Sequence, residues 1–484
     1  MNKELKRVSA VVLIMFLGLF ASTSLIQVVA ADSLQADGRN ARTLYASYSA
    51  ERGPILVDGQ PIAQSVPSDD EYKFLRVYAS GPLYAPVTGY LTLNQGNTGL
   101  EASLGDYLSG SSNQQFFDQI NAVVTGQNPK GAAVETTIDP VLQQVAWDAL
   151  GDYQGAVIAI DPKTGAILAM VSKPSFDPNE LAVHDTQLVI DTYERLLNSA
   201  DEALINRTMN GNLDPPGSTF KLVVTAAALE SDRYTPDSEF PNPSSLPLPQ
   251  SDSIITNSDE GTCGPGEVVT MGTALRLSCN IPFAELGLEL GTRALREQAN
   301  RFGFNDTIDV PMTSTESVYP RALDDPQAML SAFGQSSVRA SPLQMAMVSM
   351  AVANGGTLMK PTLVESIIAA NQAELLRIQP AVFRQSMSQQ TAATMTELMV
   401  ANISNGAASG ARIGGVEVAG KTGTAENGVD EPYSLWFTGF APANDPQIVV
   451  AVVVQNGGGL GQAGTSNGIP APIAKKVLEA VLFR

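Results

Sequence analysis

Histidine is the side chain that this 484-residue sequence has least of, since His184 is the only one. A single histidine argues against a Ser-His-Asp triad and against a metal site built from several histidines. We expect His184 to be a surface residue, and we expect neither a metal nor a cofactor. Any serine chemistry in this chain therefore needs another base, and lysine is the natural candidate.

Positive charge is also scarce, because 29 Lys and Arg residues face 49 Asp and Glu residues, a formal net charge of −20. This balance argues against nucleic acid or anionic lipid as a partner. Charged residues make up 16% of the chain and hydrophobic residues 44%, which is typical of a folded protein. The length allows two or three domains.

Residues 8–30 contain no charged side chain, and Lys3, Lys6 and Arg7 precede that run. The run is long enough to span a bilayer, and the preceding cations predict a cytoplasmic N-terminus. The alternative is a cleaved signal peptide, because residues 28–30 resemble a small-residue cleavage site. Signal peptides usually have a hydrophobic region of about 7–15 residues, so we favour an uncleaved anchor. We expect residues 1–7 in the cytoplasm, residues 8–30 in the membrane and the remainder outside it.

Only two cysteines occur, Cys263 and Cys279. Outside the cytosol such a pair favours a disulfide, which would stabilise the fold by about 3 kcal/mol in the chain-entropy model. The alternative is two free thiols, since the sequence does not fix the distance between them.

The first part of the chain outside the anchor, residues 31–134, is polar and rich in turns, which predicts many short strands and loops. The character changes near residue 135, where Asp139 and Pro140 are typical of a helix start. Two apolar runs, 155–161 and 166–171, are joined by Pro and Gly residues and predict a β-hairpin.

The remaining chain is mainly helical from residue 220 to about 350, with loops expected at 231–262 and 303–325. Buried strands are predicted near the end, followed by a helix. Strands at both ends with helices between them indicate an α+β domain whose sheet unites the two ends. The late elements are expected over 416–418, 434–441, 448–454 and 475–482.

Ser218 and Lys221 stand three residues apart, so on a helix they share one face. A neutral amine at Lys221 would take the hydroxyl proton and make Ser218 a nucleophile. The apolar run 222–229 indicates a buried helix, and burial lowers the pKa of a lysine. Taken alone, the pair is better explained by a serine that caps a helix and a lysine that extends to the surface, so the companion motifs must decide.

Two further motifs follow in order. Ser278, Cys279 and Asn280 come directly after a predicted helical piece at 271–277, and residues 421–424, Lys-Thr-Gly-Thr, lie on or beside a strand. Each motif also has a second copy, Ser-Ser-Asn at 111–113 and Lys-Thr-Gly at 163–165. We interpret residues 111–113 as part of a polar loop and residues 163–165 as the hairpin turn.

The ordered set Ser-x-x-Lys, Ser-x-Asn and Lys-Thr-Gly resembles the signature of the penicillin-recognising acyl-transfer enzymes. These are serine transpeptidases of the cell wall, D-Ala-D-Ala carboxypeptidases and serine β-lactamases. The resemblance covers roughly residues 135–484, with accessory matches at 333–335 and 342–346.

The anchor and the N-terminal residues 39–40, 52–55 and 99–101 look like the pedestal, or dimerisation-like, domain of class B penicillin-binding proteins. The resemblance is greatest to the short actinobacterial penicillin-binding protein A type. It implies an α+β transpeptidase fold, an antiparallel sheet with a helical subdomain at 135–484, preceded by a β-rich pedestal at 31–134. We expect neither a glycosyltransferase domain nor C-terminal accessory repeats.

The resemblance also implies roles in acylation. Ser218 would attack the penultimate D-alanine carbonyl of a peptidoglycan stem peptide while Lys221 accepts its proton. The backbone N–H groups of Ser218 and Thr424 would form the oxyanion hole. Ser278 would pass a proton to the departing D-alanine, and Asn280 would hold the peptide's side-chain amide.

The third motif would bind the substrate's terminal carboxylate. Lys421 supplies positive potential, and Thr422 and Thr424 hydroxyls, flanking Gly423, would bond it. An amine from a neighbouring strand would then complete the cross-link, whereas a β-lactam would leave Ser218 acylated. The implied partners are stem peptides, β-lactams, a membrane glycosyltransferase and division-machinery proteins.

Several interpretations stay open at this point. Asn280 fits a helix C-cap and Lys421 a surface strand residue. A disulfide at Cys279 would shape the loop of the second motif. A β-lactamase or β-lactam sensor shares the three motifs, although the large pedestal argues against a β-lactamase and the single span against common sensors. A scaffold of the division machinery with a dispensable activity is the alternative from another class.

Overall fold

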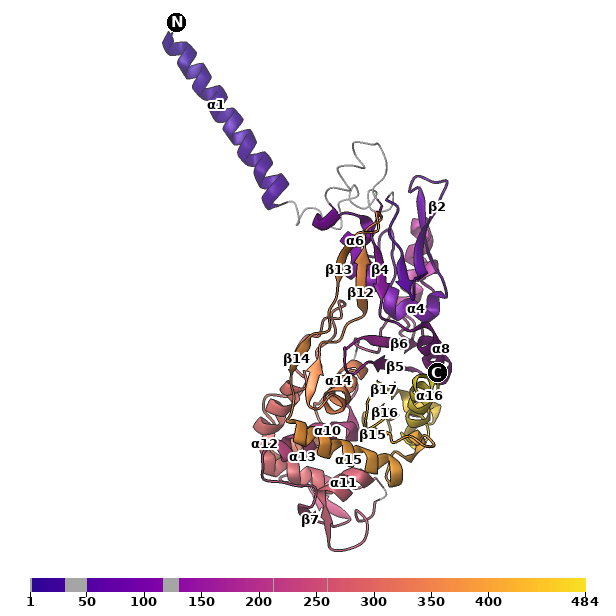
Figure 1. Ribbon diagram of the computed structural model, residues 1–484. Helices are drawn as coiled ribbons and strands as arrows, with labels where there is room; N and C mark the ends of the chain where they lie inside the picture. The colour runs from indigo at the N-terminus through magenta and orange to yellow at the C-terminus, as the bar shows by residue number, and fades with distance from the viewer. Residues whose placement is uncertain (1, 31–49, 116–129, 212, 259) are drawn as a thin grey trace.

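The computed structural model describes residues 2–30, 50–115, 130–211, 213–258 and 260–484. Figure 1 shows an elongated body with the first helix standing apart from it, a β-rich pedestal at one end and a larger α+β part at the other. The predicted fold class is confirmed. Residues 39–40, which carried part of the resemblance to a pedestal, lie outside the described residues.

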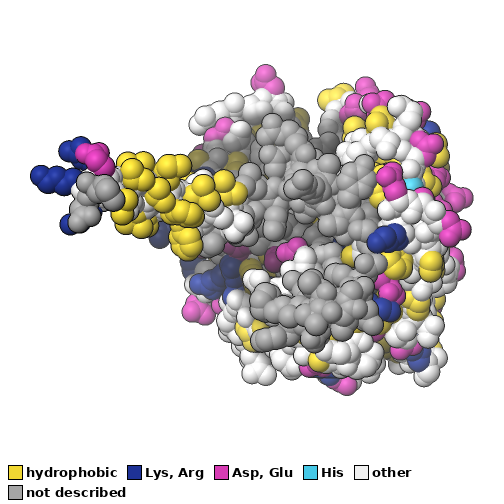
Figure 2. All heavy atoms as spheres, turned by 90° about the horizontal axis from the view of Figure 1, so that it is seen from above, with side chains coloured by type: hydrophobic (Ala, Val, Ile, Leu, Met, Phe, Trp, Pro, Cys, Tyr) yellow, Lys and Arg dark blue, Asp and Glu magenta, His cyan; other side chains and the backbone are white. Residues whose placement is uncertain are grey.

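The N-terminal helix α1 (Asn2–Ser24) continues as a π-helical turn (Leu25–Val29). The stretch Lys3–Gln27 contains an 18-residue window with a mean hydropathy of 2.2, so this helix is long and apolar enough to cross a membrane. Figure 2 shows their apolar side chains exposed along α1, with Lys and Arg side chains at its beginning. The predicted apolar helix is present, and its length and composition suit both a membrane span and a signal sequence.

The pedestal is built on a six-stranded sheet with the order β13-β12-β4-β1-β2-β3, in which β1 and β4 are parallel and the other pairs antiparallel. Strands β12 and β13 come from residues more than 200 positions after the rest, so the larger α+β part of the chain extends this sheet. The sheet comprises β1 (Ile55–Val57), β2 (Gln60–Pro67), β3 (Phe74–Tyr78), β4 (Ala133–Thr136), β12 (Val364–Ile368) and β13 (Glu374–Arg377); short helices α4 (Gly81–Thr88), α5 (Gly99–Ser103) and α6 (Gly105–Ser109) and a 3-10 turn (Asn113–Gln115) accompany it.

The central sheet of the larger part is fully antiparallel, with the order β15-β16-β17-β5-β6. It unites the predicted hairpin with the late strands, as the sequence indicated. Alternate residues of β17 face opposite cores, so Val450 and Val452 pack with α8 and α16 while Val449 and Val453 pack toward the helical part. The elements are α8 (Pro140–Leu150), β5 (Gly155–Ile160), β6 (Ile167–Lys173), β15 (Ala419–Ala425), β16 (Ser434–Ala441), β17 (Ile448–Val454) and α16 (Pro470–Leu482).

Two local predictions need correction. The strand expected over 416–418 is wrong, because Ile413 and Val416 form an isolated bridge around a glycine pair and the strand begins only at Ala419. Gly415 has φ +78°, which a turn of this kind requires. The loop expected over 231–262 contains short two-stranded ribbons: β7 (Glu239–Pro241) with β10 (Val268–Thr270), and β8 (Ser245–Pro247) with β9 (Ile254–Thr256).

The helical subdomain packs on the other face of the central sheet. Helix α10 is buried along nearly its whole length, which confirms the prediction from its apolar run. The predicted helix start at Asp139 is confirmed as well, because its side chain accepts from the N–H of Leu142. The remaining elements are α9 (Thr186–Leu197), α10 (Lys221–Glu230), α11 (Met271–Leu277), α12 (Ile281–Arg301), α13 (Asp325–Ser331), α14 (Pro342–Ala353), α15 (Gln389–Asn405), β11 (Thr357–Met359), β14 (Val382–Gln385) and the 3-10 turns Pro178–Glu180, Gly217–Phe220, Ser409–Ala411, Asn456–Gly459 and Gly461–Ala463.

Candidate active site

Ser218 lies in the 3-10 turn Gly217–Phe220, which α10 continues. The turn is pressed against β15: a Cβ on Gly217, where φ is +53°, would stand 2.7 Å from the carbonyl oxygen of Thr424. The N–H of Gly217 also donates to the carbonyl of Gly334 at 3.1 Å. The contacts of Gly217 with Thr424 and with Gly334 therefore fix the turn, and Ser218 within it is only 8% exposed.

Lys221 is fully buried and its amine touches three oxygen atoms. Lys221 Nζ lies 3.0 Å from Ser218 Oγ, 2.7 Å from the carbonyl oxygen of Ser278 and 2.9 Å from Asn280 Oδ1. A neutral amine has two N–H groups and one lone pair. With the N–H groups donated to Ser278 and Asn280, the lone pair is left for the hydroxyl proton of Ser218.

The environment of Lys221 favours that neutral form. Burial lowers the pKa of Lys221 well below its ordinary value, and the positive charge of Lys421 lowers it further. The aromatic rings of Phe283 and Phe333, with centroids 5.5 and 6.0 Å from Nζ, supply apolar walls. The alternative in which Lys221 extends to the surface is wrong.

Ser278 and Asn280 occupy the junction between α11 and α12. Ser278 adopts a left-handed conformation, φ +65°, as the C-cap of α11. Its carbonyl accepts a hydrogen bond from Lys221, and its hydroxyl accepts one from Lys421. Asn280 is the N-cap of α12 rather than the C-cap of α11, and its Nδ2 donates to the carbonyl of Thr256 at 3.0 Å. The helix C-cap interpretation of Asn280 is therefore wrong. Cys279, between them, is joined to Cys263 by a disulfide with a Cα–Cα distance of 5.8 Å.

Lys421 is fully buried on β15, the edge strand of the central sheet. Its Nζ donates to Ser278 Oγ at 2.6 Å and to the carbonyl of Thr422 at 2.9 Å. Burial lowers the pKa of Lys421 to about 7. The alternative of a surface strand residue is wrong, and Ser278 joins the two lysines through its carbonyl on one side and its hydroxyl on the other.

The rest of the third motif faces the nucleophile turn. A Cβ on Gly423 would stand 2.7 Å from the carbonyl oxygen of Pro216 and 2.9 Å from the N–H nitrogen of Thr219, so a side chain has no room there. The carbonyl of Thr424 approaches Gly217, and a strand residue directs its N–H and its C=O to the same side. The N–H of Thr424 therefore points out of the free edge of β15, toward the turn that carries the nucleophile.

Two residues that no motif contains complete the surroundings. Ser466, a buried residue, donates from Oγ to the carbonyl of Gly423 at 2.6 Å and lies 2.8 Å from Thr424 Oγ1. Asp214 accepts from Ser434 Oγ at 3.0 Å and Gln455 Nε2 at 2.8 Å, which ties the chain before the nucleophile to β16 and to the end of β17. The position of Asp214 just before Pro-Pro-Gly was a usable signal in the sequence, whereas nothing distinguishes Ser466.

The second copies of the motifs lie elsewhere. Lys163 is exposed in the turn between β5 and β6 and donates to Asp445 Oδ1 at 2.8 Å. Residues 111–113 belong to the pedestal. The residues of the three ordered motifs, in contrast, lie together where the nucleophile turn, the α11–α12 junction and β15 meet. Within the described ranges, no group of three or more His, Cys, Asp or Glu side chains is arranged to hold a metal ion.

The arrangement suits acyl transfer through a serine ester. It provides the hydroxyl of Ser218, a neutral amine at Lys221 in contact with it, and a second amine at Lys421 that remains partly charged near neutral pH. The edge of β15 adds a backbone N–H that is directed at the turn containing Ser218. A carbonyl bound between Ser218 and that edge would meet a nucleophile on one side and donors on the other.

Comparisons with known families agree with this chemistry. Residues 155–479 match the family model of the penicillin binding protein transpeptidase domain, and residues 52–134 match that of the penicillin binding protein A dimerisation domain. The chain is 41% identical to the peptidoglycan D,D-transpeptidase PbpA of Mycolicibacterium smegmatis over 491 aligned residues, which cover 100% of this chain and 99% of the relative. The PbpA of Mycobacterium tuberculosis is 38% identical with the same coverage.

Solved structures show the same likeness. Penicillin-binding protein A from M. tuberculosis, as a ceftriaxone acyl-enzyme complex, superimposes with a TM-score of 0.87 at 38% identity and covers 90% of this chain and 100% of that one. Its penicillin G acyl-enzyme complex gives a TM-score of 0.84 at 37% identity, again over 90% of this chain and 100% of that one.

Proposed function

This chain belongs to the penicillin-binding protein A family of peptidoglycan D,D-transpeptidases, and from that premise we propose that Ser218 is its acylated nucleophile and Lys221 its general base. The chain is a serine-type acyl transferase of cell-wall synthesis that β-lactams acylate. One observation carries the assignment: Lys221 Nζ lies 3.0 Å from Ser218 Oγ while two other oxygens take its N–H groups, and none of its partners among the described residues is a carboxylate.

Acylation begins when Ser218 Oγ attacks the carbonyl carbon of the penultimate D-alanine and its proton passes to the neutral Lys221. The oxygen of the tetrahedral intermediate takes its hydrogen bonds from the backbone N–H groups of Ser218 and Thr424. The C–N bond to the terminal D-alanine then breaks. The leaving amine takes up a proton from Ser278 Oγ, which contacts Lys421 Nζ at 2.6 Å. The proton that Lys221 accepted replaces it, so Lys221 is neutral again before the second half-reaction.

Substrate binding is assigned to the groups around that path. The protonated Lys421, with the hydroxyls of Thr422 and Thr424, attracts the terminal carboxylate of the donor peptide. Gly423 lets β15 lie close against the turn that carries Ser218, since its own position tolerates no side chain. Asn280 holds the donor's side-chain amide with the part of its own amide that Lys221 and Thr256 do not occupy.

The second half-reaction transfers the acyl group. The amine of a neighbouring stem peptide attacks the ester and gives a proton to the neutral Lys221. The bond to Ser218 Oγ breaks, Lys221 returns a proton to that oxygen, and the new amide forms the cross-link. A β-lactam follows the first half-reaction only: its ring opens on Ser218 and no small leaving group departs.

Location and partners extend the proposal. Helix α1 crosses the membrane with Lys3, Lys6 and Arg7 on the cytoplasmic side, because basic residues flanking an apolar helix favour that orientation. The pedestal and the transpeptidase part then lie outside the cytoplasm, next to the peptidoglycan. A membrane glycosyltransferase and proteins of the division machinery are the partners that supply and direct its substrate. Cross-linking of the full chain in growing cells should recover them, and recovery of neither would remove this part of the proposal.

The decisive experiment labels the full-length protein with a fluorescent penicillin and identifies the modified peptide by mass spectrometry. We expect a stable label on Ser218 and none in a Ser218→Ala variant, while Ser112→Ala, in the pedestal copy of the second motif, labels normally. A label on another residue would refute the assignment. Rapid loss of the label would indicate a hydrolase, and normal growth and septation with Ser218→Ala as the sole copy would indicate a scaffold.

A further inference from the structure

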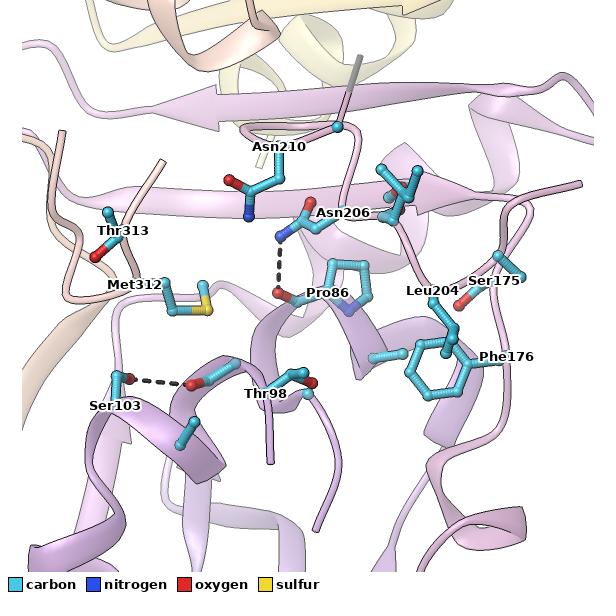
Figure 3. Close-up of a pocket in the computed structure, with 18 of the residues that line it drawn as sticks. Pro86, Thr98, Ser103, Ser175, Phe176, Leu204, Asn206, Asn210, Met312 and Thr313 are labelled. Carbon is cyan, nitrogen blue, oxygen red and sulfur yellow. Dashed lines mark hydrogen bonds between the residues drawn. The ribbon is translucent and has the colours of Figure 1, made fainter. Parts of the chain in front are cut away.

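A pocket of about 570 Å³ lies at the junction of the pedestal and the transpeptidase part, away from the three motifs. Ligand pockets in proteins usually measure about 300–1,000 Å³, so its size suits a small molecule. Pro86, Thr98 and Ser103 of the pedestal form one wall (Figure 3). Asn206 and Asn210, from the segment before the nucleophile turn, face them, and the loop of Met312 and Thr313 closes one side.

The described residues that line the pocket include no charged side chain, although 16% of the whole sequence is charged and the chain has a net charge of −20. Its polar groups are hydroxyls and amides, and its apolar groups include Phe176, Leu204 and Met312. A cavity of this kind does not compensate an ionised ligand, because a charge without a partner is costly in a partly desolvated site. It suits an uncharged molecule with both hydrogen-bonding groups and an apolar face.

Most of the polar groups around the pocket are already bonded within the protein. Asn206 Nδ2 donates to the carbonyl of Pro86 at 3.0 Å, which ties the two parts together, and Ser175 Oγ donates to the carbonyl of Pro82 at 2.7 Å. These bonds make the two walls rigid relative to each other. They also leave fewer polar groups of the lining free to form hydrogen bonds with a ligand.

Asn210 and Thr313 are the exceptions. Asn210 Oδ1 accepts from the N–H of Thr315 at 3.0 Å, which fixes the orientation of the amide. Its Nδ2 then points into the pocket (Figure 3) and makes no hydrogen bond to the described part of the chain. Thr313 Oγ1 likewise has no partner among the described residues. An amide donor and a hydroxyl are thus available at one end of a pocket whose other end, at Phe176 and Leu204, is apolar.

We propose that this junction pocket binds an uncharged ligand of the N-acetylated amino-sugar class. The acetamido carbonyl of such a sugar accepts from Asn210 Nδ2, its hydroxyls bond Thr313 and the rim hydroxyls, and its C–H face packs on Phe176 and Leu204. The choice of ligand rests on the proposed function, since the peptides that a peptidoglycan transpeptidase joins are carried on chains of N-acetylated sugars. The pocket itself is independent of that function.

The test titrates N,N′-diacetylchitobiose into the full-length protein in a sugar-free detergent and measures Kd by calorimetry. The de-acetylated disaccharide, which is cationic, is the comparison ligand. Two variants address the pocket: Asn210→Asp keeps the acceptor for Thr315 but removes the free donor, and Ala102→Trp fills the space from α5. Ala370→Trp, on the exposed turn between β12 and β13, is the matched control for an added indole.

We expect saturable binding by the wild type and by Ala370→Trp, and a Kd raised at least about tenfold in Asn210→Asp and in Ala102→Trp. Equal affinity for the de-acetylated disaccharide, unchanged binding in Asn210→Asp, or no binding by the wild type would overturn the proposal. Asn210→Asp decides the result if Ala102→Trp fails to fold. Labelling of Ser218 by penicillin in the same samples reports the proposed function separately, so that failure of the pocket and failure of the enzyme assignment are distinguishable.

Discussion

The pedestal and the active site each bury two basic side chains, but only the pedestal provides a carboxylate between them. Arg52 Nε lies 2.5 Å from Glu101 Oε2, and Arg76 Nε lies 2.7 Å from Glu101 Oε1. Lys221 and Lys421 share no such partner within the described ranges. Their common neighbour is Ser278, which offers only a carbonyl and a hydroxyl.

The difference determines which groups keep their charge. Burial alone raises the pKa of Glu101, but the charges of Arg76 and Arg52 and their hydrogen bonds outweigh burial and lower it, so the carboxylate stays ionised. Nothing offsets burial at the lysines, and the pKa of each falls. The pedestal cluster, in which a carboxylate balances the two arginines, stabilises the fold. The two lysines of the active site have no balancing carboxylate among the described residues, and one of them can therefore act as a base.

Replacing Lys221 should give the largest effect on acylation. It also gives the clearest contrast between the active site and the pedestal, because activity should fall while stability does not. Lys221→Met removes the base, so we expect the second-order rate constant of penicillin acylation to fall about 10²–10⁴-fold. The thermal midpoint at pH 7 should not fall, because the buried amine is held against its preferred charged state. Stopped-flow acylation and differential scanning calorimetry measure the two effects. A large loss of stability with normal acylation would show that Lys221 stabilises the fold and is not the base.

The matched change in the pedestal is Glu101→Gln. It leaves two buried guanidinium groups without an anion, and the expected loss is about 3–5 kcal/mol of unfolding free energy. Acylation per folded molecule should stay within a factor of about two, since Ser218 lies in another part of the chain. Urea denaturation and penicillin titration measure these quantities. A stable Glu101→Gln protein with impaired acylation would show that the pedestal cluster serves the active site directly.

Breaking the Cys263–Cys279 disulfide should affect both stability and the site. The chain-entropy model gives about 3 kcal/mol for a loop of this length. Because Cys279 stands between Ser278 and Asn280, we also expect slower acylation after reduction or in Cys263→Ser with Cys279→Ser. Thermal midpoints and acylation rates before and after reduction provide the measurement, and no change in either would sink the idea that the bond shapes this turn.

Titration of Lys421 should give the smallest effect. With a pKa near 7, Lys421 loses its charge above neutrality, and acylation of the free enzyme by a carboxylate-bearing penicillin should decline about tenfold per pH unit there. Protonation of Lys221 gives the acid limb. In Lys421→Arg, which stays charged, the alkaline decline should move to higher pH. An alkaline limb at the same pH in Lys421→Arg would assign it to another group.

The same pKa has a consequence for stability, with its sign set by proton linkage. Lys421 titrates near 7 when folded and near 10.5 when unfolded, so the unfolded state binds more protons between these values. The contribution of Lys421 to the free energy of unfolding therefore rises with pH across this window. Subtracting the pH profile of Lys421→Met from that of the wild type isolates this contribution.

Much of this arrangement could be predicted from the sequence, because the motifs and the strands are local patterns. The shortage of histidine identified lysine as the base, and the apolar run after Lys221 predicted its burial, on which the pKa depends. Strands β16 and β17 were predicted from continuous apolar residues. A strand on or beside residues 421–424 was also predicted, but its start was placed too early, at 416, because the Gly-Lys-Thr-Gly-Thr sequence lacks the apolar residues typical of strands.

What could not be predicted depends on contacts between distant residues. Nothing local in residues 364–377 indicates that they extend the pedestal sheet. The Ser278 carbonyl that receives Lys221 is a backbone group, which no side-chain pattern reveals. Asp214 and Ser466 act through partners on other strands, so their roles became visible only with the fold.

The pairing of β12 with β4 bears on how such a protein is inherited. Two strands of the pedestal sheet are encoded within the transpeptidase part of the gene, so a recombination event that exchanges everything before residue 135 for an unrelated leader leaves β12 with an open edge. A chimaera of this kind keeps all three motifs and still exposes an aggregation-prone ribbon. We therefore expect the two parts to be inherited together. Substitutions in β12 and β13 should be constrained by their fit to the pedestal sheet as strictly as substitutions in the pedestal's own strands.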